Sequence, residues 1–205
     1  MTAPARRALL LALNLVAFQL AWFACAVGAA RGTPVVGIAA VAGAVGLQLV
    51  VSDARSRDAV LLAVAVAMGL GWDTIMMRLH VVAYASPGPF EGWAPAWILA
   101  LWALFATTLR GPLRWVHGRW WLAALLGGIG GPLSYWGAVR LGAGEFADFR
   151  LAMVVLAGGW AVMTPCLTEL ARSLNRSGRP ARALSASPPA GPPGSPAAPG
   201  WDRWT

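Results

Sequence analysis

Six apolar segments, separated by short polar breaks, constrain the fold of this chain more than any other feature. Each is about as long as the ~20 helical residues that cross a ~30 Å hydrocarbon core. Their limits are residues 8–30, 34–52, 59–79, 93–109, 120–141 and 151–171. The sequence therefore predicts an all-α polytopic membrane protein with six transmembrane helices in a bundle.

The composition supports a membrane protein and excludes a nucleic-acid-binding one. Of the 205 residues, 58% are hydrophobic and 12% are charged, which is more apolar and less charged than a soluble domain. The net charge of +8 would suit a nucleic-acid partner, but no basic stripe with interleaved stacking aromatics is visible. We therefore expect no nucleic-acid partner.

Arginine placement predicts the orientation of the segments. All 16 basic residues are arginines, and loops on the cytoplasmic side of a membrane carry the excess of positive charge. In the six-span arrangement four arginines fall on one side, and the remaining twelve fall on the other; the four are Arg31, Arg78, Arg140 and Arg150. Both termini are thus predicted to be cytoplasmic.

The first apolar segment has an alternative interpretation. It could instead be a cleaved signal peptide, since Arg6 and Arg7 precede it, although its length and its Asn14 and Gln19 favour a packed helix.

Residues 1–172 form the expected transmembrane domain. Residues 173–205 are rich in Pro, Ala and Gly, which predicts a disordered cytoplasmic tail whose PxxP spacings could also dock an SH3-like groove.

Asp73 is an ionisable residue inside the third apolar segment. Helical rise from the flanking loops places Asp73, Ser134 and Tyr135 at one depth, roughly 22 Å from the cytoplasmic edge. Arg140 lies near that level, and its side chain should tilt back toward Asp73. Arg78, five residues after Asp73, is turned about 140° away around the helix and should not pair with it.

These four residues, Asp73, Ser134, Tyr135 and Arg140, are the candidate ligand site or polar cluster. A buried carboxylate needs a charge partner, hydrogen bonds or a proton. The alternative is therefore a purely structural Asp73 that ties the third and fifth helices together.

Two further polar features are predicted inside the membrane. Helical rise places Asn14, Gln48 and Thr164 at a shared depth, roughly 10 Å from the cytoplasmic edge. They form a secondary polar layer, either as interhelical hydrogen bonds or as part of a solute path. Gly130, Gly131 and Pro132 predict a kinked or broken helix, because proline removes a backbone donor and glycine makes unwinding cheap. That break is either the wall of a site or a packing kink.

No catalytic or metal-binding motif is present. Cys25 and Cys166 form no CxxC pair, and His80 and His117 fall on opposite sides of the predicted membrane. We therefore expect no catalytic residue, metal or cofactor, and an enzyme is the less favoured class.

Two runs of residues resemble a known bacterial family. They are Trp-x-x-Phe-x-Thr-Thr-Leu at 102–109 and Gly-Gly-Pro-x-Ser-Tyr at 130–135, supported by Asn14 to Phe23 and Gly71 to Thr74. With these, residues 8–172 resemble the family catalogued as domain of unknown function 2878. Arg110-Gly111-Pro112 departs from the Asn-centred turn usual in that family, which leaves the role of that loop open.

The resemblance implies a small multi-pass protein of the bacterial inner membrane, with no established activity to carry over. Members often lie beside genes for membrane-lipid modification, so it also implies a role accessory to lipid binding or modification, with membrane lipids and possibly another membrane protein as partners. The alternatives are a small-solute or proton-coupled transporter that uses Asp73, and a structural subunit of a membrane complex. A lipid role predicts an apolar groove opening sideways near Ser134, whereas a transporter predicts a polar, water-reaching cavity lined by Asp73.

Overall fold

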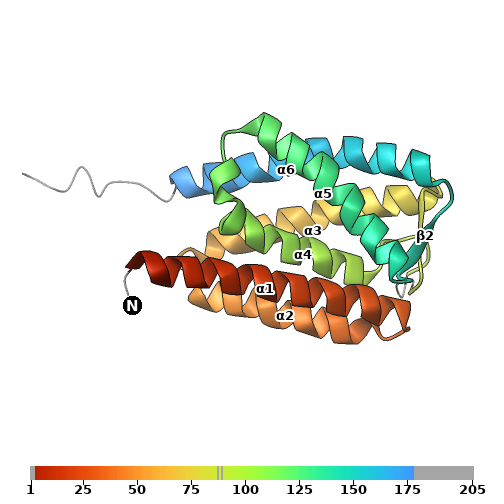
Figure 1. Ribbon diagram of the computed structural model, residues 1–205, viewed down its shortest axis with the longest axis horizontal. Helices are drawn as coiled ribbons and strands as arrows, with labels where there is room; N and C mark the ends of the chain where they lie inside the picture. The colour runs from red at the N-terminus through yellow and green to blue at the C-terminus, as the bar shows by residue number, and fades with distance from the viewer. Residues whose placement is uncertain (1–2, 87, 89, 178–205) are drawn as a thin grey trace, which may run out of the picture.

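The computed structural model describes residues 3–86, 88 and 90–177. Over these residues the chain forms six α-helices, one 3-10 helix and two short strands (Figure 1). In chain order they are α1 (Ala3–Ala30), α2 (Pro34–Val51), α3 (Arg55–Arg78), β1 (Val82–Tyr84), α4 (Ala96–Leu109), η1 (Pro112–Val116), α5 (Trp120–Arg140), β2 (Gly144–Phe146) and α6 (Phe149–Ser177). The predicted all-α class is confirmed.

Five of the six described helices are long and apolar enough to cross a membrane. The exception is α4, which has 14 residues, because Pro95 precedes it and Gly111-Pro112 follow it shortly after its end. Its side chains nonetheless lie in the core of the bundle, where Trp97, Trp102 and Leu109 are almost completely buried. The predicted fourth span, which began at residue 93, is therefore shorter than expected.

The helices lie side by side along the long axis of the molecule, with α1 packed on α2, α3 on α4 and α5 on α6 (Figure 1). Small residues allow the close approaches. A Cβ at Gly37 of α2 would lie 2.3 Å from the Cα of Cys25 in α1, so these two backbones are in contact. Small residues at such positions are how helices associate inside a membrane.

A two-stranded antiparallel sheet, β1 with β2, closes one end of the bundle, which the sequence did not predict. β1 pairs with β2 in the register Val82 with Phe146 and Tyr84 with Gly144. The pairing joins the loop after α3 to the loop after α5, and it fixes the position of Tyr84.

The start of α1 and the end of α6 are both at the other end of the bundle (Figure 1). There Arg110, at the end of α4, forms an ion pair with Asp58 of α3 and donates through Nε to Asn175 of α6 at 3.0 Å. The unusual Arg110-Gly111-Pro112 turn thus ties three helices together at this end.

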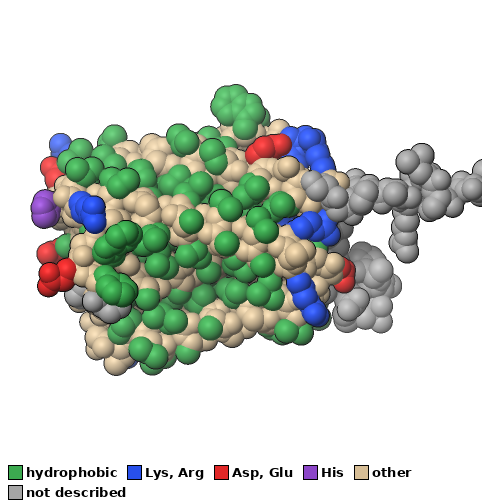
Figure 2. Space-filling view, turned by 180° about the vertical axis from the view of Figure 1, so that it is seen from behind, with side chains coloured by type: hydrophobic (Ala, Val, Ile, Leu, Met, Phe, Trp, Pro, Cys, Tyr) green, Lys and Arg blue, Asp and Glu red, His purple; other side chains and the backbone are tan. Residues whose placement is uncertain are grey.

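The flank between the two ends is apolar. Figure 2 shows charged side chains gathered at both ends of the visible face and hydrophobic side chains between them. Large hydrophobic residues are exposed along it, among them Val36, Val50, Leu133 and Val154. In water such a surface would be unusual, whereas a bilayer covers it.

α6 continues to Ser177, past the predicted sixth span of residues 151–171, and residues 178–205 of the predicted tail lie outside the described part of the chain. The sequence predicted a kinked or broken helix at Gly130, Gly131 and Pro132. A broken helix is wrong, because α5 is one continuous helix with Pro132 inside it.

Candidate functional site

Asp73 of α3 is completely buried. One turn before it, Gly69 leaves room for the Trp102 indole of α4, since a Cβ there would lie 2.2 Å from that ring. The glycine therefore allows α3 and α4 to approach closely and brings Trp102 up to the carboxylate.

Three neutral side chains donate hydrogen bonds to the Asp73 carboxylate. The hydroxyls of Tyr84 and Tyr135 lie 2.5 and 2.6 Å from Oδ1, and Nε1 of Trp102 lies 2.6 Å from Oδ2. The donors come from β1, α5 and α4, so one carboxylate joins four elements. Because hydrogen bonds to a charged group contribute about 1.5–3 kcal/mol each, three of them offset much of the cost of burying it.

The sequence pointed to Tyr135 by its depth but missed Tyr84 and Trp102. Tyr84 follows α3 in a non-helical segment, where helical rise gives no position. A signal was nevertheless present, since the chain has only two tyrosines and both of them donate to Asp73.

Within the described residues no cation pairs with Asp73. Arg140 is exposed, and the structure does not bring it into the cluster. Arg78 also lies elsewhere, as its helical position predicted. Its Nε donates to the Gly92 carbonyl at 3.3 Å and its guanidinium lies 5.7 Å from the centre of the Trp93 ring.

A cavity of about 500 Å³ lies beside this cluster, among α1, α4, α5 and α6. It extends from the two-stranded sheet, at Tyr84 and Gly144, to Leu113 of η1. Along α4 its wall runs from Trp97 to Phe105, a helical rise of about 12 Å. This volume falls within the roughly 300–1,000 Å³ usual for small-molecule sites.

Aromatic side chains form much of the cavity wall. They are Phe18, Trp22, Tyr84, Trp97, Trp102, Phe105, Tyr135 and Trp160. The indoles of Trp102 and Trp160 stack with their centres 4.7 Å apart and 14° between their planes. None of the described lining residues is charged. Asp73 itself is not in the wall, because its three donors stand between it and the cavity.

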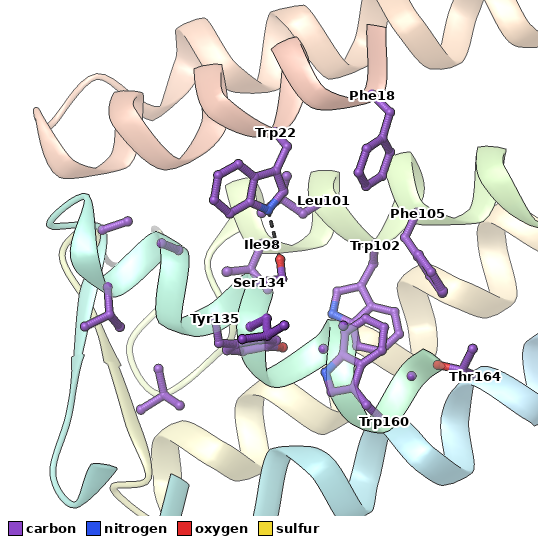
Figure 3. Close-up of a pocket in the computed structure, with 18 of the residues that line it drawn as sticks. Phe18, Trp22, Ile98, Leu101, Trp102, Phe105, Ser134, Tyr135, Trp160 and Thr164 are labelled. Carbon is purple, nitrogen blue, oxygen red and sulfur yellow. Dashed lines mark hydrogen bonds between the residues drawn. The ribbon is translucent and has the colours of Figure 1, made fainter. Parts of the chain in front are cut away.

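The cavity reaches the flank of the bundle between α1 and α5. Gln19 of α1 and Gly130 of α5 line it and are exposed, and Leu126 and Leu133 line it with exposed fractions of 40% and 51%. In Figure 3 the Trp22 indole of α1 reaches toward α5. The side of the cavity therefore opens on the apolar flank.

Ser134 lies at this opening rather than at Asp73. Its Oγ accepts a hydrogen bond from Nε1 of Trp22 at 2.9 Å, drawn as the dashed line in Figure 3. The sequence grouped Ser134 with Asp73 by depth, but its hydrogen-bond partner is Trp22. Depth alone does not say which way a side chain faces around its helix.

The predicted second layer is divided in the structure. Asn14 Nδ2 donates to Oε1 of Gln48 at 3.4 Å, which joins α1 to α2. Thr164 is elsewhere, on the cavity wall, where a Cβ at Gly127 would lie 2.2 Å from its hydroxyl oxygen.

The glycines of α5 fit the helix to its neighbours instead of breaking it. A Cβ at Gly131 would lie 2.2 Å from the Trp160 ring of α6. Gly130, one residue earlier, has nothing within 4 Å of its own Cβ position and faces the cavity. Adjacent glycines thus serve two purposes, close packing on α6 and open space on the α1 side.

The helices, their apolar flank and the internal cavity define an all-α membrane protein. Residues 11–166 match the family described as protein of unknown function DUF2878, and the chain belongs to that family. The match includes Asp73 and its three donors, Ser134 and all of α2 to α5. Neither a curated protein nor a solved structure matches the chain.

Proposed function

We propose that this protein binds membrane lipids in the cavity between α1 and α5 and serves as an accessory to their binding or modification. It does so as a six-span protein of the bacterial inner membrane with both ends in the cytoplasm. The bound molecule enters sideways from the bilayer, with its apolar part along Phe18, Phe105 and Leu126.

The observation that supports this proposal is the chemistry of the cavity and of its opening. Described lining residues are uncharged and largely aromatic or aliphatic, and the opening beside Leu133 and Ser134 lies on the flank that acyl chains would surround. Burial of apolar surface favours an apolar occupant by about 25 cal/mol per Å².

Transport by Asp73 is less well supported. A proton- or solute-coupling carboxylate must meet water or solute, whereas Asp73 is completely buried and lies behind Tyr84, Tyr135 and Trp102. A structural subunit would need no open cavity of this size.

A pair of glycine substitutions tests lipid binding. Gly130→Leu places a side chain in the cavity mouth, where the Cβ meets no atom within 4 Å, so the helix packing is kept. Gly158→Leu adds the same side chain on the exposed side of α6, where the Cβ position is equally open, and is the matched control.

The measurement is native mass spectrometry of the full chain released from micelles after extraction from its membrane. Wild-type protein and Gly158→Leu should retain bound lipid, and Gly130→Leu should retain much less. Equal retention by Gly130→Leu and Gly158→Leu, or no lipid on the wild-type protein, would refute the proposal.

A further inference from the structure

We infer that the cavity holds its lipid by a carbonyl oxygen, which accepts hydrogen bonds from the Trp160 indole and the Thr164 hydroxyl of α6. This inference rests on the proposed lipid-binding function and names the chemical group that the site recognises. Its basis is that both side chains line the cavity, while Nε1 of Trp160 and Oγ1 of Thr164 are buried without a hydrogen-bond partner in the described part of the chain.

Thr164 differs from three other buried threonines. Thr107, Thr108 and Thr168 each donate to the backbone carbonyl three residues earlier, at 2.7, 2.7 and 2.9 Å, which is a common way to satisfy a hydroxyl inside a helix. Thr164 is 4% exposed and makes no such bond. Its hydrogen is therefore available to an acceptor in the cavity that it lines.

Trp160 supplies the second donor. An indole nitrogen can only donate, and the residue is 9% exposed. Buried polar groups in folded proteins are nearly always hydrogen-bonded. Two unpaired donors in the wall of one cavity therefore indicate that the acceptor comes from the molecule that the cavity binds.

The two donors belong to one part of the wall. Trp160 and Thr164 are four residues apart, so they lie one turn apart on the same face of α6, with about 6 Å of helical rise between them. A Cβ at Gly127 of α5 would lie 2.2 Å from Oγ1 of Thr164 and 2.3 Å from the Trp160 carbonyl oxygen, so α5 packs directly against this face. Figure 3 shows both side chains on the cavity wall, with the Thr164 oxygen on the side of Trp160.

Most other donors of the wall already have acceptors. Five N–H and O–H groups are paired with Ser134, with Asp73 or with the Ser86 carbonyl, and they belong to Trp22, Tyr84, Trp97, Trp102 and Tyr135. Gln19 and Ser134 also carry donors, but they lie at the opening. The inner part of the cavity therefore binds an acceptor best beside Trp160 and Thr164.

Depth and chemistry favour a carbonyl as this acceptor. α6 begins at Phe149, so helical rise places Trp160 roughly 16 Å along it, near the middle of a ~30 Å hydrocarbon core. A carbonyl oxygen has two lone pairs and no hydrogen that would need an acceptor in turn. An ester lipid or a quinone can carry such an oxygen into the bundle together with its hydrocarbon.

The test compares methyl hexadecanoate with hexadecyl methyl ether, which has the same chain length and lacks only the carbonyl oxygen. Both are offered to the full protein in micelles at equal total concentrations, and bound probe is counted by native mass spectrometry. We expect the ester to bind about tenfold more tightly, since pairing a buried donor that is otherwise unsatisfied is worth that much. Infrared spectra of the bound ester, labelled with an isotope at its carbonyl, should show the stretching band at lower wavenumber than in hexadecane.

Variants of α6 locate the effect. Thr164→Val keeps the shape of the side chain but removes the donor, so the preference for ester over ether should fall severalfold and the infrared shift should shrink. Thr168→Val is the matched control one turn later, because Thr168 is buried, donates to the Pro165 carbonyl and does not line the cavity. Thr164→Ser should retain the preference, and Trp160→Phe is the second variant that should lower it.

The same valine variants have opposite effects on the delipidated protein. Thr164→Val removes a buried hydroxyl that has no partner and should raise the midpoint of a denaturing-detergent titration, whereas Thr168→Val loses a hydrogen bond and should lower it. A midpoint that falls equally in both variants would show that the Thr164 hydroxyl is already paired, and would overturn the inference.

A second pair of probes, decyl benzoquinone and decylbenzene, distinguishes the two sources of the carbonyl. A preference that depends on Thr164 in the ester pair alone identifies ester lipids, and one in the quinone pair alone identifies quinones. Equal binding within both pairs overturns the inference, as does a preference that survives in both Thr164→Val and Trp160→Phe. If Gly130→Leu still lowers uptake in that case, lipid binding stands without carbonyl recognition; failure of every probe to bind the wild-type protein overturns both.

Discussion

At the scale of single residues, Asp73 shows how an apolar helix can hold a carboxylate. Its oxygens accept from Tyr84, Tyr135 and Trp102, so the charge is distributed over three donors on three other elements. The depth of Asp73 and Tyr135 could be predicted from helical rise. The identity of the other two donors, Tyr84 and Trp102, could not be predicted, because it depends on the register of the two-stranded sheet and on the rotation of α4.

Replacing Asp73 should destabilise the fold more than removing any one donor. Asp73→Ala leaves three buried donors without an acceptor, at about 1–3 kcal/mol each, so we expect a loss of at least about 3 kcal/mol. Tyr135→Phe removes one of the bonds and should cost roughly 1–2 kcal/mol. The free energy of unfolding is measured by denaturing-detergent titration in mixed micelles.

The control for this pair is Asp53→Ala, because Asp53 is exposed and its loss should change the free energy by no more than about 0.5 kcal/mol. The cluster would not be the structural centre that we describe if Asp73→Ala proved as mild as Asp53→Ala.

His117 should make the loop before α5 sensitive to acid. Burial lowers the pKa of this imidazole from its ordinary value of 6.5, and the positive charges of Arg114 and Arg172 lower it further. The hydrogen bond to the Leu109 carbonyl and the negative charge of Glu169 act in the opposite direction. Nε2 lies 2.7 Å from the Leu109 oxygen, so the neutral ring donates there. The folded state binds the proton more weakly than the unfolded state does.

Stability from His117 is therefore complete above the ordinary pKa of 6.5 and falls as the pH decreases below it. We expect the wild-type protein to lose more stability than His117→Gln between about pH 7.5 and about pH 5.5, a window set by the imidazole titration. The same detergent titration at both pH values checks this, with His80→Gln as the control on an exposed histidine. Parallel losses in the wild type and His117→Gln would show that this proton does not matter.

At the scale of elements, α5 shows what the Gly-Gly-Pro run does. The run predicted a kinked or broken helix, because proline lacks a donor and glycines unwind easily. The helix continues because Gly127 and Gly131 let it pack tightly on Thr164 and Trp160 of α6, so tertiary packing outweighs local propensity. Sequence alone could not decide this, since the same glycines suit both outcomes.

Alanine at two adjacent positions of α5 should have opposite effects. Gly131→Ala puts a methyl group 2.2 Å from the Trp160 ring and should cost about 1–3 kcal/mol through overpacking. Gly130→Ala meets no atom within 4 Å and should be neutral or stabilise by up to about 1 kcal/mol through helix propensity. Unfolding titrations of both variants provide the comparison. Equal destabilisation would contradict the packing that we assign to Gly131.

At the scale of the whole molecule, the sequence predicted the helices well and their connections poorly. Apolar length located all six described helices, and caps such as Thr33-Pro34 set sharp limits. The two-stranded sheet was missed because β1 and β2 have three residues each, too few for an alternating pattern. The cavity was foreseen only as a possibility near Ser134, because it arises from how α1, α4, α5 and α6 are placed together.

Reporter fusions test the arrangement of the whole chain in the membrane. Six spans with both ends in the cytoplasm predict that a reporter fused at Pro188 is cytoplasmic and one fused at Pro89 is external. If the short α4 does not cross the membrane, the Pro188 reporter would become external while the Pro89 reporter stays in place. That second pattern would rule out six spans.

The central claim is that lipid occupies the cavity between α1 and α5, and photocrosslinking tests it most directly. A lipid with a photoreactive group on its acyl chain is added to the protein in native membranes, and the labelled peptides are mapped after illumination. Labels should concentrate at Phe18 to Trp22 and at Gly130 to Ser134, and should be lost in Gly130→Leu but kept in Gly158→Leu. Labels spread over exposed outer positions such as Val36 and Val50 of α2, and unaffected by Gly130→Leu, would contradict the account.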